Sequence, residues 1–325
     1  MCGLAGILYF HKSYNEDQLS KKMINQLNHR GPDYTGHWSQ KNDGIFLSHS
    51  RLSIIDVSNF GNQPMISNSN RWVMVFNGEI YNYKQLKQNI NNLHNIKFKG
   101  NSDSEVLLNY FDLYGVDETL KKIDGMFAIG LWDNINKSLY LIRDRAGEKP
   151  LYYYKDENSL FFASELKALK IVPNFNKKLS KEALNYYFKI GFIPSDECIY
   201  QNVKKIIPGE YVEFVKNSKE IKKKKYWKVE DYINNNSKKS LNDEINITEN
   251  LLNRSVKERL NADVPIGTLL SGGIDSSLVS YYAQKNSLKK INTYCVGFYN
   301  KNYDETEKSK KISQYLNTNH TNINV

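Results

Sequence analysis

The sequence is poor in cysteine and has no long apolar run. Its three cysteines, Cys2, Cys198 and Cys295, are too few and too widely spaced for a disulfide framework or a paired-cysteine metal site. No apolar run approaches the roughly 18 residues that a membrane helix needs. The apolar stretch 4–10 has neither a basic segment before it nor a cleavage pattern. We therefore expect a cytoplasmic protein that does not bind membranes.

Acidic residues are also fewer than basic ones. The chain has 45 Lys and Arg against 35 Asp and Glu, a formal net charge of +10. An excess of cations attracts nucleic acids, but these lysines are scattered among Asn, Ile and Tyr, and the only dense run is 222–225. We therefore expect an ordinary solvated face and no nucleic-acid partner.

The first part of the chain has the pattern of an α+β fold. Short strands separated by turn signals are predicted at 3–10, 44–50, 71–76, 126–132, 138–142, 151–154 and 160–163. Leu19, Met23 and Leu27 lie at helical spacing before a stop at Gly31. A second helix is predicted from a capping box at 102–105 to Gly115.

The pattern of predicted secondary structure changes near residue 210. A hairpin at 211–215 and 221–227 precedes the polar segment 234–242. Helix, strand, helix and strand then follow at 247–260, 266–270, from 276 and 291–298, and this alternation predicts a parallel sheet. We expect one domain at 2–209, a hairpin and linker at 210–242, and an incomplete second domain at 243–325.

The stretch 270–277, LSGGIDSS, follows an apolar strand and opens a helix. Glycines let the backbone approach an anion, serines add donors, and the helix N-terminus adds partial positive charge. It is not a P-loop, because no Gly-Lys-Ser/Thr follows. A tight turn with a serine cap is the alternative.

SGGIDSS resembles the pyrophosphate loop of the ATP pyrophosphatase family, whose members activate a carboxylate or carbonyl as an adenylate. The resemblance implies Mg-ATP as substrate, no tightly bound organic cofactor, and Asp275 beside the magnesium. The nucleotide contacts that it implies are Leu270, Ser271, Gly272, Gly273, Asp275, Ser276 and Val296.

Cys2 would carry a free α-amine if Met1 were removed. An α-amine titrates near pH ~7.7–8.0 and a thiol near ~8.5, so one residue would hold both nucleophile and base. Taken alone, an ordinary cysteine at the second position is the better explanation of this pattern.

Four further stretches, 29–33, 49–56, 76–82 and 100–105, together with Met-Cys-Gly, resemble class II glutamine amidotransferases, the N-terminal-nucleophile glutaminases. Stretches 124–128 and 143–152 extend the likeness. It implies a sandwich of antiparallel sheets with flanking helices, followed by the start of an α/β ATP pyrophosphatase domain. Cys2 would be the nucleophile, and the Asn77 amide with the Gly78 N–H would form the oxyanion hole.

The same resemblance assigns a glutamine pocket. Arg51 would bind the α-carboxylate and Asp103 the α-ammonium. The other pocket residues that it implies are Leu52, Ser53, Ile54, Ile55 and Glu79. Each motif also has an ordinary reading: Asn77-Gly78 as a type I′ turn, Asp103 as a complement to a helix dipole, and 30–33 as a helix end rather than a mobile flap.

A glutaminase followed by this loop resembles the glutamine-hydrolysing asparagine synthetases. That likeness implies ammonia from glutamine, aspartate activated by ATP as β-aspartyl-AMP, and a homodimer as one option for assembly. A related amidotransferase acting on another carboxylate, such as a sugar acid in surface-polysaccharide synthesis, stays open. The family's second motif, SGEGxDE, is absent. We expect a fragment that hydrolyses glutamine without making asparagine.

Overall fold

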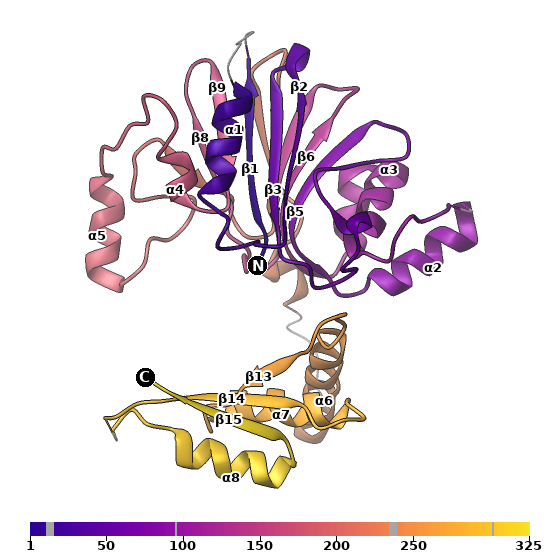
Figure 1. Cartoon of the computed structure of the whole chain (residues 1–325), viewed down its shortest axis with the longest axis vertical. Helices are drawn as coiled ribbons and strands as arrows, with labels where there is room; N and C mark the ends of the chain where they lie inside the picture. The colour runs from indigo at the N-terminus through magenta and orange to yellow at the C-terminus, as the bar shows by residue number, and fades with distance from the viewer. Residues whose placement is uncertain (11–15, 95, 234–238, 301) are drawn as a thin grey trace. The chain divides into compact units, whose positions relative to one another are not determined.

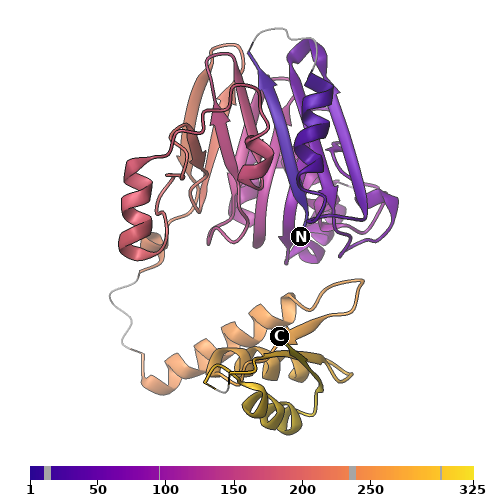
Figure 2. The same ribbon diagram turned by 60° about the vertical axis from the view of Figure 1, so that its left-hand side comes forward.

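A computed structural model describes residues 1–10, 16–94, 96–233, 239–300 and 302–325 of the chain. The chain divides into two compact units, Met1–Ile233 and Asn234–Val325. Figures 1 and 2 show each unit as its own layered body. No helix in the described residues combines the length and apolarity needed to cross a membrane.

The first unit contains two six-stranded antiparallel sheets that pack face to face (Figure 2). Sheet A has the spatial order β10 (Val203–Lys205), β8 (Tyr152–Lys155), β9 (Ser159–Ala163), β1 (Gly3–Tyr9), β3 (Ile45–Arg51), β2 (Tyr34–Gln40). Sheet B has the order β12 (Glu220–Lys225), β11 (Glu210–Val215), β7 (Ser138–Arg143), β6 (Gly125–Asp133), β5 (Trp72–Ile80), β4 (Met65–Ile66). The predicted antiparallel sandwich is confirmed.

Helices cover the outer faces of both sheets. Sheet A packs against α1 (Glu16–Asn25) and α4 (Leu166–Leu169), and sheet B packs against α2 (Tyr83–His94) and α3 (Asp103–Lys122). The remaining helical segments are α5 (Lys181–Ile190) and the 3-10 turns η1 (Lys41–Asp43), η2 (Asn59–Gly61) and η3 (Val229–Tyr232). The unit is thus an α/β/β/α arrangement of four layers.

Strand alternation sorts side chains between these layers. Leu4 and Leu8 of β1 meet Val73 and Val75 of β5 in the core between the sheets. Trp132 lies fully buried in the same core. A large side chain buried in this way contributes about 1.5–3 kcal/mol. The opposite face of each sheet packs against its helices.

The two helices predicted for the first unit differ from the sequence expectations in their ends and capping. Helix α1 ends at Asn25, and residues 26–30 continue as turns that still bury Leu27. Only half of the expected capping box forms, because Ser102 Oγ accepts the Glu105 N–H while the Glu105 carboxylate binds backbone N–H groups of residues 99 and 100. Gly115 interrupts α3 with φ 73°, and helical structure then resumes to Lys122.

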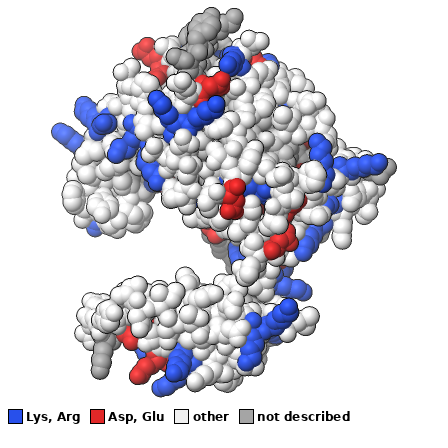
Figure 3. Space-filling view, in the orientation of Figure 1, with Lys and Arg blue, Asp and Glu red and all other residues white. Residues whose placement is uncertain are grey.

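The β11–β12 hairpin forms the edge of sheet B, where β11 pairs with β7. The sequence had grouped this hairpin with the linker. The basic run on β12 is partly ion-paired, with 3.3 Å between Lys223 Nζ and Asp196 Oδ2 and 2.8 Å between Lys224 Nζ and Asp117 Oδ2. On the face shown in Figure 3, basic and acidic side chains are interspersed.

The second unit is a parallel sheet with helices, as the sequence predicted. Its strands lie in the order β13 (Gly267–Leu269), β14 (Asn292–Gly297), β15 (Asn319–Asn324), and its helices are α6 (Leu241–Glu258), α7 (Ile274–Lys285) and α8 (Thr306–Leu316). A capping box of Ser240 and Asp243 opens α6. Among the described residues, the buried hydrophobic cluster of the second unit comprises only Val256, Tyr282 and Ala283.

Candidate functional site

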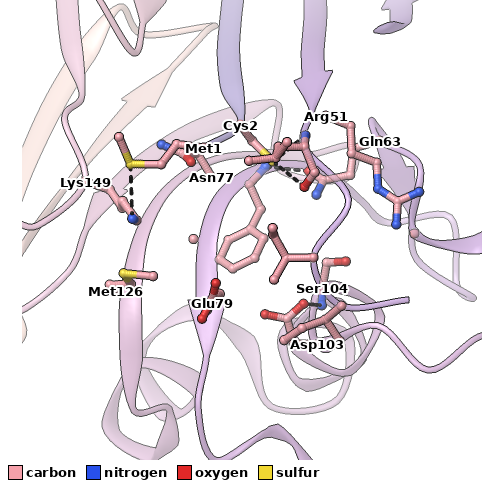
Figure 4. Close-up of a pocket in the computed structure, with 16 residues that line it drawn as sticks. Met1, Cys2, Arg51, Gln63, Asn77, Glu79, Asp103, Ser104, Met126 and Lys149 are labelled. Carbon is pink, nitrogen blue, oxygen red and sulfur yellow. Dashed lines mark hydrogen bonds between the residues drawn. The ribbon is translucent and has the colours of Figure 1, made fainter. Parts of the chain in front are cut away.

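A cavity of about 160 Å³ opens at one edge of the first unit (Figure 4). Its lining contains all the residues predicted for glutamine cleavage except Ser53. The lining residues are Met1, Cys2, Arg51, Leu52, Ile54, Ile55, Gly61, Gln63, Phe76, Asn77, Gly78, Glu79, Asp103, Ser104, Met126 and Lys149. Residues from Met1 to Lys149, which are up to 148 positions apart in the sequence, are therefore brought together around one cavity.

Strand register explains why these side chains meet. Cys2 immediately precedes β1, and Gly3 pairs with Ser50, so Cys2 lies opposite Arg51 at the end of β3. Asn77 has the same parity on β5 as Val73 and Val75, which face the core between the sheets. Both sheets thus direct polar groups toward the same edge of the sandwich.

A buried histidine links the two sheets next to the cavity. His49 Nε2 lies 2.9 Å from the Phe76 carbonyl oxygen, which joins β3 to β5 one residue before Asn77. Complete burial lowers the pKa of His49 to about 4, so the imidazole is neutral at neutral pH and its Nε2–H is the donor. This bond fixes the spacing between the strand that carries Arg51 and the strand that carries Asn77.

The Cys2 thiol lies against the backbone of Leu52. Its Sγ is 3.4 Å from the Leu52 nitrogen and 3.6 Å from the Leu52 oxygen. Burial raises the pKa of the thiol, and the hydrogen bond with Leu52 opposes that rise. When the proton leaves, the sulfur can still accept from the Leu52 N–H, so this contact favours the thiolate.

Arg30 holds the main chain of Cys2. Its Nε donates to the Cys2 carbonyl oxygen at 2.9 Å, and its Nη1 donates to Glu165 Oε1 at 2.7 Å. The side chain is 9% exposed. The sequence identified Arg30 with the end of a helix or a flap, whereas the structure gives it a positioning contact with the candidate nucleophile.

Asn77 presents an unpartnered donor to the cavity. The residue is 1% exposed, and its Nδ2 has no hydrogen-bond partner in the described structure. Leaving a buried donor unsatisfied costs about 1–3 kcal/mol. A ligand oxygen in the cavity would satisfy it, which is the arrangement that an oxyanion hole requires.

Gly78 lies within β5 and not in a turn, so the type I′ turn suggested by Asn77-Gly78 is wrong. Gly78 has no positive φ. A Cβ at this position would lie 2.1 Å from the Met126 carbonyl oxygen. Glycine is therefore needed for the close approach of β6 and not for turn geometry.

Arg51 is anchored, and some of its N–H donors have no partner among the residues that the structure describes. Nη1 donates to the Ser58 carbonyl oxygen at 2.7 Å and to Asn62 Oδ1 at 2.9 Å, and Nη2 donates to the Asp56 carbonyl oxygen. A guanidinium has five N–H groups, so the Nε–H and one Nη2–H are left to bind a carboxylate. The loop that follows β3 thus orients the group without exhausting it.

Asp103 joins helix α3 to β5. Its Oδ2 accepts the Ile80 N–H at 2.8 Å and its Oδ1 accepts the Ser104 N–H at 2.9 Å. Burial, followed by the nearby Glu79 charge, raises the pKa of Asp103 to about 7. Two carboxylates at one wall of the cavity favour a bound cation, because the cation offsets the repulsion between them.

Ser53 lies outside the cavity lining, and its backbone N–H donates to Asp33 Oδ2 at 2.7 Å. Conversely, sequence reasoning missed Gln63 and Lys149, which do line it. Gln63 Oε1 accepts the Phe76 N–H at 2.6 Å. Lys149 could have been predicted from the sequence, because it belongs to the stretch 143–152 that resembles the amidotransferase family. Gln63 carried no signal.

The loop of the second unit follows β13 and opens α7. Gly272 adopts φ 83°, which only glycine adopts without strain. Ser276 Oγ accepts the Ser271 N–H at 3.2 Å, a hydrogen bond within the loop. The N-cap Gly273 makes no side-chain cap bond and is exposed, as is Asp275. The first N–H groups of α7 thus face outward with glycines beside them, a geometry that suits phosphate.

The other two residues predicted for nucleotide binding lie at the neighbouring strand ends. Leu270 is buried, and its N–H donates to the Tyr294 carbonyl oxygen at 2.8 Å. Val296 is 43% exposed near the end of β14. Leu270 therefore supports the loop from below, while Val296 offers an open apolar surface.

Comparison with known proteins assigns both parts of the chain. Residues 1–227 match the family model for a glutamine amidotransferase domain, and residues 248–325 match that for asparagine synthase. The chain is 38% identical to a putative asparagine synthetase [glutamine-hydrolyzing] 2 of Methanocaldococcus jannaschii, covering 98% of this chain and 64% of that protein. It is 34% identical to asparagine synthetase [glutamine-hydrolyzing] 1 of Bacillus subtilis, covering 97% of this chain and 49% of that protein.

Solved structures agree on the fold. The glutamine phosphoribosylpyrophosphate amidotransferase of B. subtilis, complexed with ADP and GMP, aligns with a TM-score of 0.51 at 16% identity, covering 98% of this chain and 65% of that chain. This chain spans about half to about two thirds of the length of the two relatives above. The model match over residues 1–227 establishes that the protein belongs to the glutamine amidotransferase domain family, and its last 78 residues are similar to asparagine synthase.

Proposed function

We propose that the first unit hydrolyses glutamine to glutamate and ammonia, with the Cys2 thiol as nucleophile. The observation that carries this proposal is the cavity in which Cys2, the unpartnered Asn77 amide, Arg51 and Asp103 converge. The nucleophile and the oxyanion donor match the carbon and oxygen of glutamine's carboxamide. The cation and the anion match its α-carboxylate and α-ammonium. The family membership supports the same reaction.

Removal of Met1 would give Cys2 its α-amine, which takes the thiol proton. The thiolate attacks the carboxamide carbon, and Asn77 Nδ2 with the Gly78 N–H receives the resulting oxyanion. The ammonium formed on Cys2 protonates the leaving nitrogen, so that ammonia departs and a γ-glutamyl thioester remains. Water, deprotonated by the same amine, then attacks the thioester and releases glutamate and the thiol.

The amino-acid head of glutamine would bind at the other end of the cavity. The free Nε–H and Nη2–H of Arg51 suit the α-carboxylate. Asp103 and Glu79 suit the α-ammonium. Ile54 and Ile55 line the space between these polar ends. Binding at both ends would place the carboxamide at the thiol, which is the orientation that converts binding into rate.

The decisive experiment measures glutaminase activity of the wild type and Cys2→Ala on protein whose N-terminus has been checked for Met1 removal. We expect loss of at least about a thousandfold in kcat, since no other group replaces the nucleophile. Undiminished activity in Cys2→Ala would refute the mechanism. Cys198→Ala serves as the matched control, because Cys198 is buried in the core between sheet A and its helices.

For the second unit, we propose a part in the ATP-dependent amidation of aspartate. The β-carboxylate of aspartate would attack ATP and release pyrophosphate, and ammonia would then displace AMP. Ser271, Gly272 and Gly273 would hold the phosphates of Mg-ATP, with Asp275 facing the metal, which arrives as part of that substrate. The open backbone at the start of α7 supports this assignment.

We further propose that this 325-residue chain performs only the glutaminase half by itself. The small buried cluster of the second unit and the exposed Val296 support that limit. An assay of ATP- and aspartate-dependent pyrophosphate release on this chain tests it, and robust release would contradict it. A sugar acid is the alternative acceptor, and adding other carboxylates to the same assay with the longer relatives separates the two.

A further inference from the structure

The stretch 143–152 presents one side chain to the cavity that the mechanism above does not use. Lys149 lies across the cavity from Arg51 (Figure 4). Its main chain is fixed on both sides, since the Lys149 N–H donates to Asp144 Oδ2 at 3.0 Å and Arg143 Nε donates to the Lys149 carbonyl oxygen at 2.8 Å. Two charged side chains therefore hold this lysine in place.

The Lys149 ammonium is buried without an anion. The residue is 6% exposed. Among the described residues, its side chain makes one polar contact, 3.4 Å from Nζ to Met1 Sδ, and no carboxylate oxygen lies within 4.0 Å. A thioether is a weak acceptor, and a buried unpaired charge is costly. An apolar side chain of the same length would fill the space at a lower cost in folding free energy. We therefore expect the Lys149 charge to affect the groups in the cavity.

Several charged groups surround the N-terminus from the elements packed around it. Arg30 follows α1, Asp33 precedes β2, and Lys149 follows β7. Arg51, Glu79 and Asp103 face the same cavity from β3, β5 and α3. Arg30 is already engaged with Glu165. Arg51 also lacks an ion pair in the described part of the chain, but its Nη1 and Nη2 are hydrogen-bonded to the 56–62 loop. The Lys149 ammonium, by contrast, contacts only a thioether sulfur.

We propose that Lys149 is an electrostatic positioning residue for Cys2, favouring the unprotonated α-amine and the thiolate once Met1 is removed. This inference rests on the proposed glutaminase and adds a residue to it. A cation disfavours a proton on either group, so amine and thiol together lose their proton at lower pH. Burial lowers the pKa of Lys149, while the Glu79, Glu148 and Asp144 charges oppose that change and favour the ammonium.

The direct test is the pH dependence of Cys2 alkylation by iodoacetamide, measured by peptide mass spectrometry on Met1-free protein without glutamine. We expect Lys149→Met and Lys149→Gln to shift the profile upward by about one pH unit, from the loss of one nearby charge. Lys149→Arg should stay close to the wild type because it keeps the charge. Lys170→Met, at an exposed position, is the matched control.

The second readout is the acid limb of kcat at saturating glutamine, which should shift in the same direction in both neutral variants. Profiles of Lys149→Met and Lys149→Gln that superimpose on the wild type would overturn the inference. A wild type without Cys2-dependent glutaminase would instead overturn the proposed function. The alkylation result is readable in either case, because it uses no glutamine.

Discussion

The two units hold their candidate sites in different ways. In the first unit, three buried clusters pack between and outside the sheets, and several polar groups at the cavity are held by other residues, as Arg51 is by the 56–62 loop. In the second unit, three residues form the buried cluster, and the loop is held chiefly by its own serines. The first site is thus preorganised by the whole fold, and the second by local hydrogen bonds.

The sheets show the same difference. A parallel sheet is normally covered on both faces. On β14, Thr293 and Cys295 are buried, but Tyr294 and Val296 on the other face are 36% and 43% exposed. Ile323 of β15 is 51% exposed. One face of this sheet therefore contributes little hydrophobic stabilisation, which makes the two units unequal in expected stability.

The largest effect that tests this comparison is on stability. The Phe162 ring is fully buried between the sheets, where Gly6 and Gly130 leave room for it. Phe162→Ala should reduce the free energy of unfolding of the first unit by about 3–5 kcal/mol, and Val256→Ala that of the second by about 1 kcal/mol. Urea unfolding followed by tryptophan fluorescence reports the first unit alone, because all four tryptophans lie in it.

Val256→Ala should leave that fluorescence transition unchanged, and hydrogen exchange should detect its effect in α6 and α7. An equal shift of the fluorescence midpoint by both variants would contradict the comparison, since the two units would then unfold as one cooperative block.

The next effect is catalytic. Asn77→Ala removes the unpartnered donor, and we expect kcat for glutamine hydrolysis to fall by roughly 10²–10³, about 3–4 kcal/mol, with KM little changed. Steady-state kinetics on Met1-free protein measure it. An Asn77→Ala enzyme that lost affinity for glutamine at unchanged kcat would show that this amide binds the substrate rather than the oxyanion.

A smaller effect concerns pH. With the pKa of Asp103 raised to about 7, the carboxyl is neutral below that pH and cannot attract the α-ammonium. KM for glutamine should therefore rise as pH falls below 7, by about tenfold per unit well below it. Asp103→Asn should show a high KM that no longer changes across this range. A wild-type KM that is constant from pH 8 to pH 5.5 would contradict the expectation.

Much of this first unit could be predicted from sequence, and the exceptions have physical causes. The apolar strands that fill the core were found, but β2 and α2 were missed. The sequence YTGHWSQ of β2 is largely polar because the strand lies at a sheet edge. Helix α2 buries only Leu86 and Ile90. Both segments are stabilised by tertiary contacts more than by their own pattern.

Family motifs supplied the predicted glutamine-site residues, and all of them except Ser53 line one cavity, whereas the residues that hold them in place could not be predicted. Nothing in the sequence indicates that Arg30 would reach Cys2, or that His49 would bridge to β5, since both contacts join segments that are far apart in the chain. Ser53 shows the opposite failure, because a motif neighbour of Arg51 need not face the cavity.

The smallest expected effect tests that last point. Ser53→Ala should change kcat and KM by less than about twofold, as is usual for a surface substitution away from bound groups. The same steady-state assay measures it. A tenfold rise in KM would place the Ser53 hydroxyl at the substrate after all.

Strand β1 begins at Gly3, and its first pairing partner is Ser50. Residue 1 contributes no rung to the sheet, its side chain is 58% exposed, and the Arg30 bond to the chain is made at the carbonyl of residue 2. Loss of Met1 would therefore leave every strand pairing intact. The strand pairing that positions the Cys2 sulfur therefore does not require cleavage of Met1 before the chain folds.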